Sequence, residues 1–123
     1  MIIFDTLTKL ENYSRIIPHM SSIINIMDHS KPYDDEVGEY IIDDDTKYIV
    51  SAHLSSPSGF FPEEQKGKLV LEICLEGDEL VNVDGSVFHL SPGTFILYQG
   101  ESKVKRGLSF LDTVAFKTVR FIL

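Results

Sequence analysis

Glu72 is the residue of this sequence whose surroundings most favour acid–base chemistry. It lies in the apolar run LVLEICL at positions 69–75. An ionised carboxylate among such neighbours is costly unless it is paired with a cation or faces a wet cavity. A carboxyl group that opens into a cavity would have a raised pKa and could move the proton of a ligand hydroxyl. The alternative is a structural ion pair with Lys103 or Arg120, and the sequence leaves both open.

The histidines offer no comparable arrangement. They lie far apart in the sequence, none forms a His-x-His pair, and no Ser-His-Asp or Cys-His arrangement can be argued; they are His19, His29, His53 and His89. The acidic run Asp43–Asp45 lacks the ligand spacing of an EF-hand and is interpreted as a solvated turn. We therefore expect no metal and no other cofactor.

Short strands separated by turns must position Glu72. Gly77-Asp78, Asp84-Gly85 and Ser91-Pro92-Gly93 divide residues 69–98 into apolar segments, and Asp-Gly is a strong hairpin signal. Strands at this spacing predict an antiparallel barrel or sandwich whose inward positions face one cavity. The run around Glu72 is almost continuously apolar, which is typical of a strand covered on both faces.

The remaining segments complete a mainly β domain with one or two N-terminal helices packed outside the barrel. Thr8 and Glu11 have capping-box spacing in a first short helix, and Pro18 suits the first turn of a second. Lys103 is grouped with Lys105 and Arg106 in a basic patch, where all three could be solvated cations in a turn. The other expected elements are strands at 1–4, 38–43, 46–54 and 112–123, helices at about 7–13 and 16–27, and a long loop at 55–68.

Length and composition exclude several classes of protein. The 123 residues form one domain, residues 1–123, with 43% hydrophobic and 24% charged residues. The formal charge of −8 gives no electrostatic reason to bind nucleic acid or anionic lipid. No apolar run reaches membrane-spanning length, and no signal peptide is indicated. Cys74 is the only cysteine, so no internal disulfide can form and a cytoplasmic protein is expected.

The order of several short motifs resembles the YhcH/YjgK/YiaL family, which includes the small subunit of an evolved beta-galactosidase. The resemblance covers nearly the whole chain, and its motifs are LENY at 10–13, GEYIIDDD at 38–45, Glu63-x-Gln65, LEGDE at 75–79, Pro92-Gly93 and Gly100-Glu101-x-Lys103. It implies a cupin-like double-stranded β-helix. It also implies a link to the catabolism of sialic acid and other sugars, through suspected epimerases, isomerases or anomerases.

The resemblance also assigns candidate site residues. Glu63 keeps the family's first carboxylate, Gln65 stands where a histidine is expected, and Glu72 takes the polar position within the central strand. Lys103 replaces a second histidine and Arg120 replaces a lysine of the last strand. Two missing imidazoles argue against a transition metal, because an ammonium is no ligand and a carboxamide is a weak one.

Two functions follow from these residues. In the first, a sugar or sugar acid enters the barrel, Glu72 or Glu63 moves a proton, and Lys103 polarises an oxygen. Gln65, Tyr40 and Arg120 would contact the ligand, although Tyr40 could instead pack in the core. In the second, the chain is a non-catalytic carbohydrate-binding or glycosidase-regulating subunit. For catalysis by Glu72, we expect its carboxyl group to face a water-accessible barrel interior with Lys103 on the opposite side. A homodimer is also expected, from an exposed edge strand and from the habit of the family.

Overall fold

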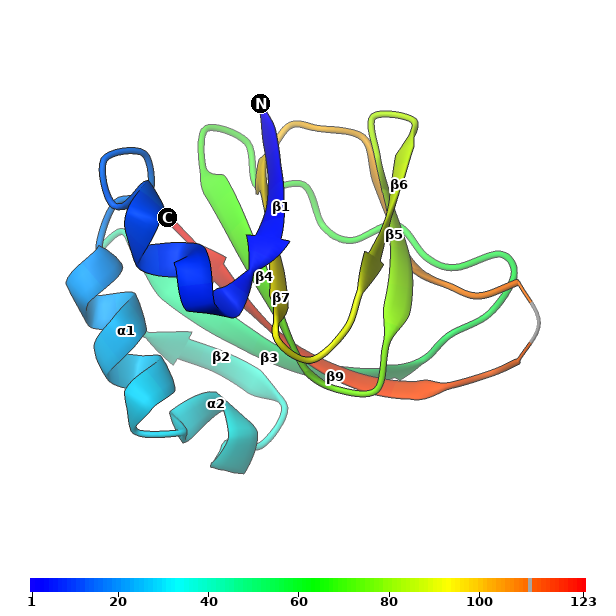
Figure 1. Ribbon diagram of the computed structural model, residues 1–123, viewed down its shortest axis with the longest axis horizontal. Helices are drawn as coiled ribbons and strands as arrows, with labels where there is room; N and C mark the ends of the chain where they lie inside the picture. The colour runs from blue at the N-terminus through cyan, green and yellow to red at the C-terminus, as the bar shows by residue number, and fades with distance from the viewer. Residues whose placement is uncertain (111) are drawn as a thin grey trace.

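Two antiparallel sheets enclose the core of the protein. The computed structural model describes residues 1–110 and 112–123. The larger sheet has the strand order β1 (Ile2–Thr6), β7 (Thr94–Gln99), β4 (Leu69–Glu76), β9 (Ala115–Ile122), β3 (Lys47–Leu54) and β2 (Gly38–Ile41). The smaller sheet has the order β6 (Ser86–Leu90), β5 (Glu79–Val83) and β8 (Val104–Leu108). Figure 1 shows the smaller sheet on one side of the larger sheet and the helices on the other. The predicted mainly β fold with outer helices is confirmed.

The apolar core between the two sheets is built from alternate residues of each strand, because side chains of a strand point to opposite faces. From the large sheet it contains Val70, Cys74, Ile96, Tyr98 and Ile122, and from the small sheet Val81, Val83, Leu90 and Val104. Cys74 is a free cysteine buried in this core. Burial raises the pKa of its thiol to about 12, so the thiolate is scarce at neutral pH.

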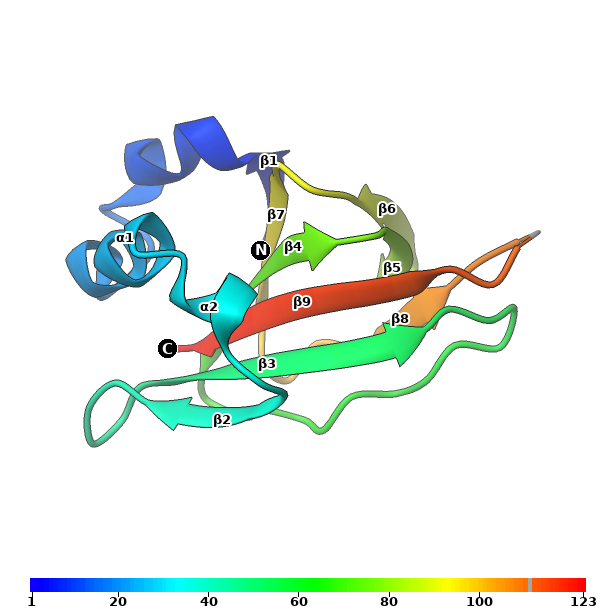
Figure 2. The same ribbon diagram turned by 90° about the horizontal axis from the view of Figure 1, so that it is seen from below.

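The opposite face of the large sheet is covered by the N-terminal helices: a 3-10 helix at Leu7–Tyr13, α1 at Met20–Asp28 and α2 at Lys31–Asp34. Leu71, Ile73 and Leu75 of β4 share a core with Ile23 and Ile26 of α1. Figure 2 shows these helices and β4 from below. Both faces of β4 are therefore covered, as its apolar run predicted.

The first helix spans Leu7–Tyr13, as predicted, but its predicted cap is wrong. Thr6 is the N-cap and no side chain caps the helix, so the capping box at Thr8 is not formed. Pro18 is outside α1, because His19 has a left-handed backbone (φ 60°) that separates it from the first helical residue. The predicted range 16–27 thus overlaps α1, whereas Pro18 does not mark its first turn.

The predicted basic turn after Lys103 is a strand. Val104–Leu108 forms β8 and pairs with β5 in antiparallel register. Strand alternation places the Val104 and Arg106 side chains in the interior, whereas Lys105 between them is only partly buried. The assignment of Arg106 to a solvated turn is therefore wrong, and this correction changes the chemistry of the interior.

The tight hairpin between β5 and β6 agrees with its sequence signal. Asp84 and Gly85 have φ values of 51° and 93°, and two consecutive positive values match the twist of the flanking strands. At the far edge of the large sheet, β2 leaves Ile41 74% exposed. That edge is available for pairing, but the homodimer itself stays a prediction. Within residues 1–110 and 112–123, no helix has the length and apolar character needed to cross a membrane.

Candidate functional site

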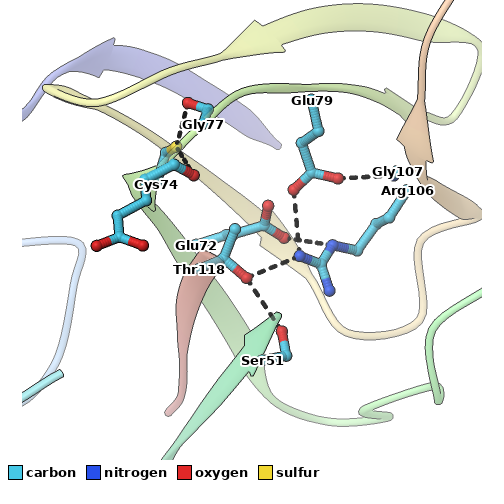
Figure 3. Close-up of polar contacts among 9 residues, drawn as sticks. Ser51, Glu72, Cys74, Gly77, Glu79, Arg106, Gly107 and Thr118 are labelled. Carbon is cyan, nitrogen blue, oxygen red and sulfur yellow. Dashed lines mark hydrogen bonds and ion pairs between the residues drawn. The ribbon is translucent and has the colours of Figure 1, made fainter. Parts of the chain in front are cut away.

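The carboxyl group of Glu72 belongs to a buried charge cluster and does not reach solvent. It is fully buried, and its Oε1 atom lies 2.8 Å from Nε of Arg106. Arg106 is 1% exposed, and its Nη2 atom donates to Oε1 of Glu79 at 3.1 Å. Figure 3 shows the guanidinium of Arg106 in contact with both carboxyl groups. The expectation of a water-accessible Glu72 opposite Lys103 is therefore wrong, since Lys103 is exposed and Arg106 takes its place.

Neighbouring strands hold the guanidinium of Arg106 in place. Its Nη2 atom also donates to Oγ1 of Thr118 on β9 at 2.9 Å, and Thr118 lies within hydrogen-bond distance of Ser51 on β3 (Oγ–Oγ1 3.2 Å). Glu79 accepts a further bond from the backbone N–H of Gly107 at 2.6 Å. The cluster therefore links both sheets through polar contacts inside an otherwise apolar core (Figure 3).

The two carboxyl groups of the cluster have opposite protonation preferences. Burial raises the pKa of Glu72 well above its ordinary value, Arg106 opposes this effect, and nearby Glu79 adds to it. Burial also acts to raise the pKa of Glu79. Contacts with Glu72, Arg106 and the Gly107 N–H outweigh burial and hold that pKa below its usual range. Geometry gives the same assignment, because Glu79 accepts two aligned hydrogen bonds, whereas neither oxygen of Glu72 has one despite the short Arg106 contact.

A pocket of about 410 Å³ opens at one end of the barrel, beside the starts of β4 and β8 and the ends of β7 and β9. It brings together four of the candidate residues, namely Glu63, Gln65, Lys103 and Arg120. Glu63 and Lys103 are exposed at its rim, and Gln65 is partly buried. Arg120 is 8% exposed and Tyr98 2%, so these two side chains form the inner wall.

The inner wall carries two buried polar groups without partners. Nε of Arg120 and the hydroxyl of Tyr98 have no well-aligned hydrogen bond within the part of the chain that the structure describes, although the two side chains lie close enough for Arg120 to act on the Tyr98 hydroxyl. Both atoms are closed to solvent, so a ligand oxygen would reach them only after a small movement of the pocket wall. Buried donors are nearly always satisfied in proteins, so two unpaired donors behind this wall favour such an approach. Burial raises the pKa of Tyr98, so its hydroxyl remains a donor at neutral pH. Arg120 stays charged, and together they could bind a carboxylate or a sugar hydroxyl.

Tyr40 does not belong to this pocket, which corrects its assignment as a ligand contact in the barrel. Its ring stacks on Tyr48 with centroids 5.0 Å apart, and its hydroxyl donates to the backbone oxygen of Glu36 at 2.6 Å. The alternation of β2 directs Tyr40 toward the helical side of the large sheet, where it packs against the outer core. Packing in the core was the alternative that the sequence left open for this residue.

The side chains of the barrel interior do not fit a transition-metal ion. Among the residues that the structure describes, no group of three or more His, Cys, Asp or Glu side chains is placed to hold one. His53 packs on the ring of Phe60 with centroids 4.6 Å apart, and His89 contacts Asp78 at 2.9 Å on the surface. Glu72 and Glu79 are both engaged by Arg106.

The long loop 55–68 supplies one wall of the pocket, and Gly100 holds it against β7. The Gly100 N–H donates to Lys68 O at 2.7 Å, and its carbonyl accepts from Gln65 N at 3.1 Å. A Cβ atom at position 100 would overlap the backbone oxygen of Gln65. The loop therefore approaches β7 as closely as only glycine permits.

We expect Gly100→Ala to destabilise the protein by about 1–3 kcal/mol, because the loop must move away from β7 to make room. Urea unfolding measures this effect. Gln99→Ala is the matched control, since Gln99 is exposed and its truncation should change stability by less than about 0.5 kcal/mol. Equal urea midpoints for wild type and Gly100→Ala would show that this loop is not held at Gly100.

The sequence alone does not mark three important residues. Arg106 lies in a basic patch that resembles a turn, Glu79 ends the LEGDE motif, and Tyr98 ends an apolar segment. A signal for Arg106 existed, because Val104, Arg106 and Leu108 alternate as one face of a strand, and a buried Glu72 requires a cation.

Comparison with solved structures identifies the fold. A cupin protein from Bacteroides fragilis superposes with a TM-score of 0.57 at 12% identity, over 72% of this chain and 78% of that chain. A protein from Neisseria meningitidis superposes with a TM-score of 0.53 at 16% identity, over 81% of this chain and 97% of that one. The architecture is thus cupin-like. No family model matches the sequence, and no curated protein matches it. The finer resemblance to the YhcH/YjgK/YiaL family stays a prediction.

Proposed function

We propose that this cupin-like protein binds a small sugar or sugar acid in the pocket at the barrel mouth. The observation that carries the proposal is the pair of buried, unpartnered donors on the inner wall, Nε of Arg120 and the hydroxyl of Tyr98. The pocket volume of about 410 Å³ lies in the usual range for small-molecule sites, roughly 300–1,000 Å³. The surrounding polar groups suit a ligand with many hydroxyl groups.

The inner wall and the rim of the pocket offer different polar groups to a ligand. A carboxylate or ring oxygen would reach the charged Arg120 and the neutral Tyr98 hydroxyl on the inner wall. Hydroxyl groups nearer the rim would meet the amide of Gln65, which both donates and accepts hydrogen bonds, and the carboxylate of Glu63, which accepts them. This arrangement distinguishes the ends of a sugar acid and would orient it with its carboxylate inward.

Sugar anomerisation is the catalytic form of this proposal, and it is favoured by Glu63 and Lys103 lining the same pocket. Glu63 would take the proton of the anomeric hydroxyl while the bond from C1 to the ring oxygen breaks. Lys103 would give a proton to that oxygen, which leaves the open-chain aldehyde, and reversal on the other face forms the second anomer. Glu72 has no place in this step, because its carboxyl group is fully buried behind the pocket. The alternative is a binding or glycosidase-regulating subunit without catalysis.

NMR titration of the protein with D-glucuronate, D-galacturonate and D-glucose tests the binding proposal. We expect the backbone signals of Tyr98, Gln65 and Arg120 to shift with saturation, while those of Tyr40 stay unchanged. Absence of saturable shifts at these three residues with all three sugars, up to millimolar concentration, would overturn the proposal. Anomer-exchange rates measured in the same samples separate the two functions, because a rate equal to the spontaneous one leaves only the binding subunit for those sugars.

A further inference from the structure

Arg120 connects the pocket to the buried charge cluster. It lies directly opposite Glu72 in the antiparallel pairing of β9 with β4. Directly opposed residues of such strands have Cβ atoms about 4.5–5.5 Å apart, so their side chains share one environment. Arg120 lines the pocket, whereas Glu72 is fully buried. A change of charge next to Arg120 at the pocket wall therefore alters the protonation equilibrium of the Glu72 carboxyl group, although solvent does not reach that group.

The groups facing Glu72 come from four other strands. They are Glu79 on β5, Tyr98 on β7, Arg106 on β8, and Thr118 with Arg120 on β9; Cys74 is the neighbouring inward residue of β4 itself. Arg106 contacts both carboxyl groups, Glu72 at 2.8 Å and Glu79 at 3.1 Å, so one guanidinium serves two buried acids. Arg120, opposite Glu72 on β9, adds a second positive charge near Glu72, whose two oxygens lack aligned hydrogen bonds.

We infer that binding of an anion at Arg120 is coupled to uptake of a proton by Glu72. In the free protein, Arg120 favours the ionised form of Glu72. A bound carboxylate satisfies Arg120 and places a second negative charge near Glu72, so the protonated form of Glu72 becomes favoured. The inference rests on the proposed binding of a sugar acid and adds that this site recognises its ligand together with a proton.

The coupling predicts how affinity depends on pH. Anion binding raises the pKa of Glu72, so affinity is highest below the Glu72 pKa of the free protein. Between the Glu72 pKa of the free protein and the higher Glu72 pKa of the complex, affinity falls by up to about tenfold per pH unit. Above both pKa values affinity is constant. In the free protein, burial already holds the pKa of Glu72 above the ordinary range of glutamate. The pH range over which affinity falls therefore lies above that ordinary range. D-Glucuronate remains ionised there, whereas D-glucose carries no charge and should show no such dependence.

Calorimetric titration with D-glucuronate in buffers of different ionisation enthalpy measures the proton directly. Within the pH range over which affinity falls, we expect uptake of up to one proton per bound D-glucuronate, and none for Glu72→Gln, which still binds. Failure of wild type to bind any of the three sugars would refute the proposed function. Binding of D-glucuronate without proton uptake at any pH between 5 and 9 would refute the coupling alone.

A second measurement needs no ligand. The infrared carbonyl band of a buried protonated carboxyl group reports the ionisation of Glu72 and should be absent in Glu72→Gln. In Arg120→Gln the loss of the positive charge should shift the disappearance of this band to higher pH. Lys105→Gln is the matched control, since Lys105 is a cation on β8 that points away from the cluster and contacts the Phe61 ring. Identical titration of the band in wild type and Arg120→Gln would also refute the coupling.

Discussion

Arg106→Met is expected to destabilise the protein by about 3–5 kcal/mol, because it leaves two buried carboxyl groups without their shared cation. Arg106 is 1% exposed and contacts Glu72 at 2.8 Å and Glu79 at 3.1 Å. The side chain also donates to Thr118, which would lose its charged partner. Urea unfolding monitored by circular dichroism measures the loss, which should appear as a lower midpoint with an unchanged slope.

Two further variants separate charge from packing. Lys105→Met removes a neighbouring cation from the outer side of β8 and should change stability by less than about 0.5 kcal/mol. Combining Arg106→Met with apolar replacements of Glu72 and Glu79 should recover much of the loss, since apolar groups do not need the missing cation. A loss below about 1 kcal/mol for Arg106→Met alone would contradict the view that this cluster depends on its guanidinium.

Arg120→Met is expected to weaken D-glucuronate binding by about 10- to 150-fold, which corresponds to the roughly 1.5–3 kcal/mol of a hydrogen bond to a charged group. Tyr98→Phe removes a neutral donor and should cost about 2- to 12-fold, or roughly 0.5–1.5 kcal/mol. Both side chains lie on the inner wall, and both have a buried donor without a protein partner. Calorimetric titration gives the affinities, and D-glucose should be less sensitive to Arg120→Met because it has no carboxylate.

Lys103→Met serves as the matched cation variant for this experiment. Lys103 lines the same pocket but is exposed at its rim, where solvent screens charges and their contribution to affinity is small. Its anomerase role would instead appear in the rate of anomer exchange. Equal D-glucuronate affinities for wild type and Arg120→Met would contradict the carboxylate site on the inner wall, provided that both proteins unfold at similar urea concentrations.

The strands were predictable from the sequence because each repeats a local pattern. Residues 69–98 contain apolar runs separated by Gly77, Asp84-Gly85 and Pro92-Gly93, and β4 to β7 follow these divisions closely. The two-sided burial of β4 was also predictable, since its apolar residues occupy both faces. β8 was not found, because two cations and a glycine within VKRGL resemble a solvated turn when read without their partners.

Of the candidate site, the sequence predicted only the pocket residues that the order of the family motifs indicates. Glu63, Gln65, Lys103 and Arg120 were selected by resemblance, and one pocket contains all four. Glu72 stands out in the sequence as an isolated carboxylate in an apolar run, and it is indeed buried. Its ion-pair partner is Arg106, whereas the sequence suggested Lys103 or Arg120. The identity of a buried counter-ion depends on which distant strand faces it, and nothing local to Glu72 or Arg106 specifies that pairing.

The position of β9 also has a consequence for synthesis of the protein. Among the strands of the large sheet, β9 comes last along the chain, yet it lies between β4 and β3 and carries both Thr118 and Arg120. During synthesis, the edges of β3 and β4 that pair with β9 therefore remain unpaired until β9 has left the ribosome. Nascent chains stalled before residue 115 should be protease-sensitive in β3 and β4 and should associate with chaperones.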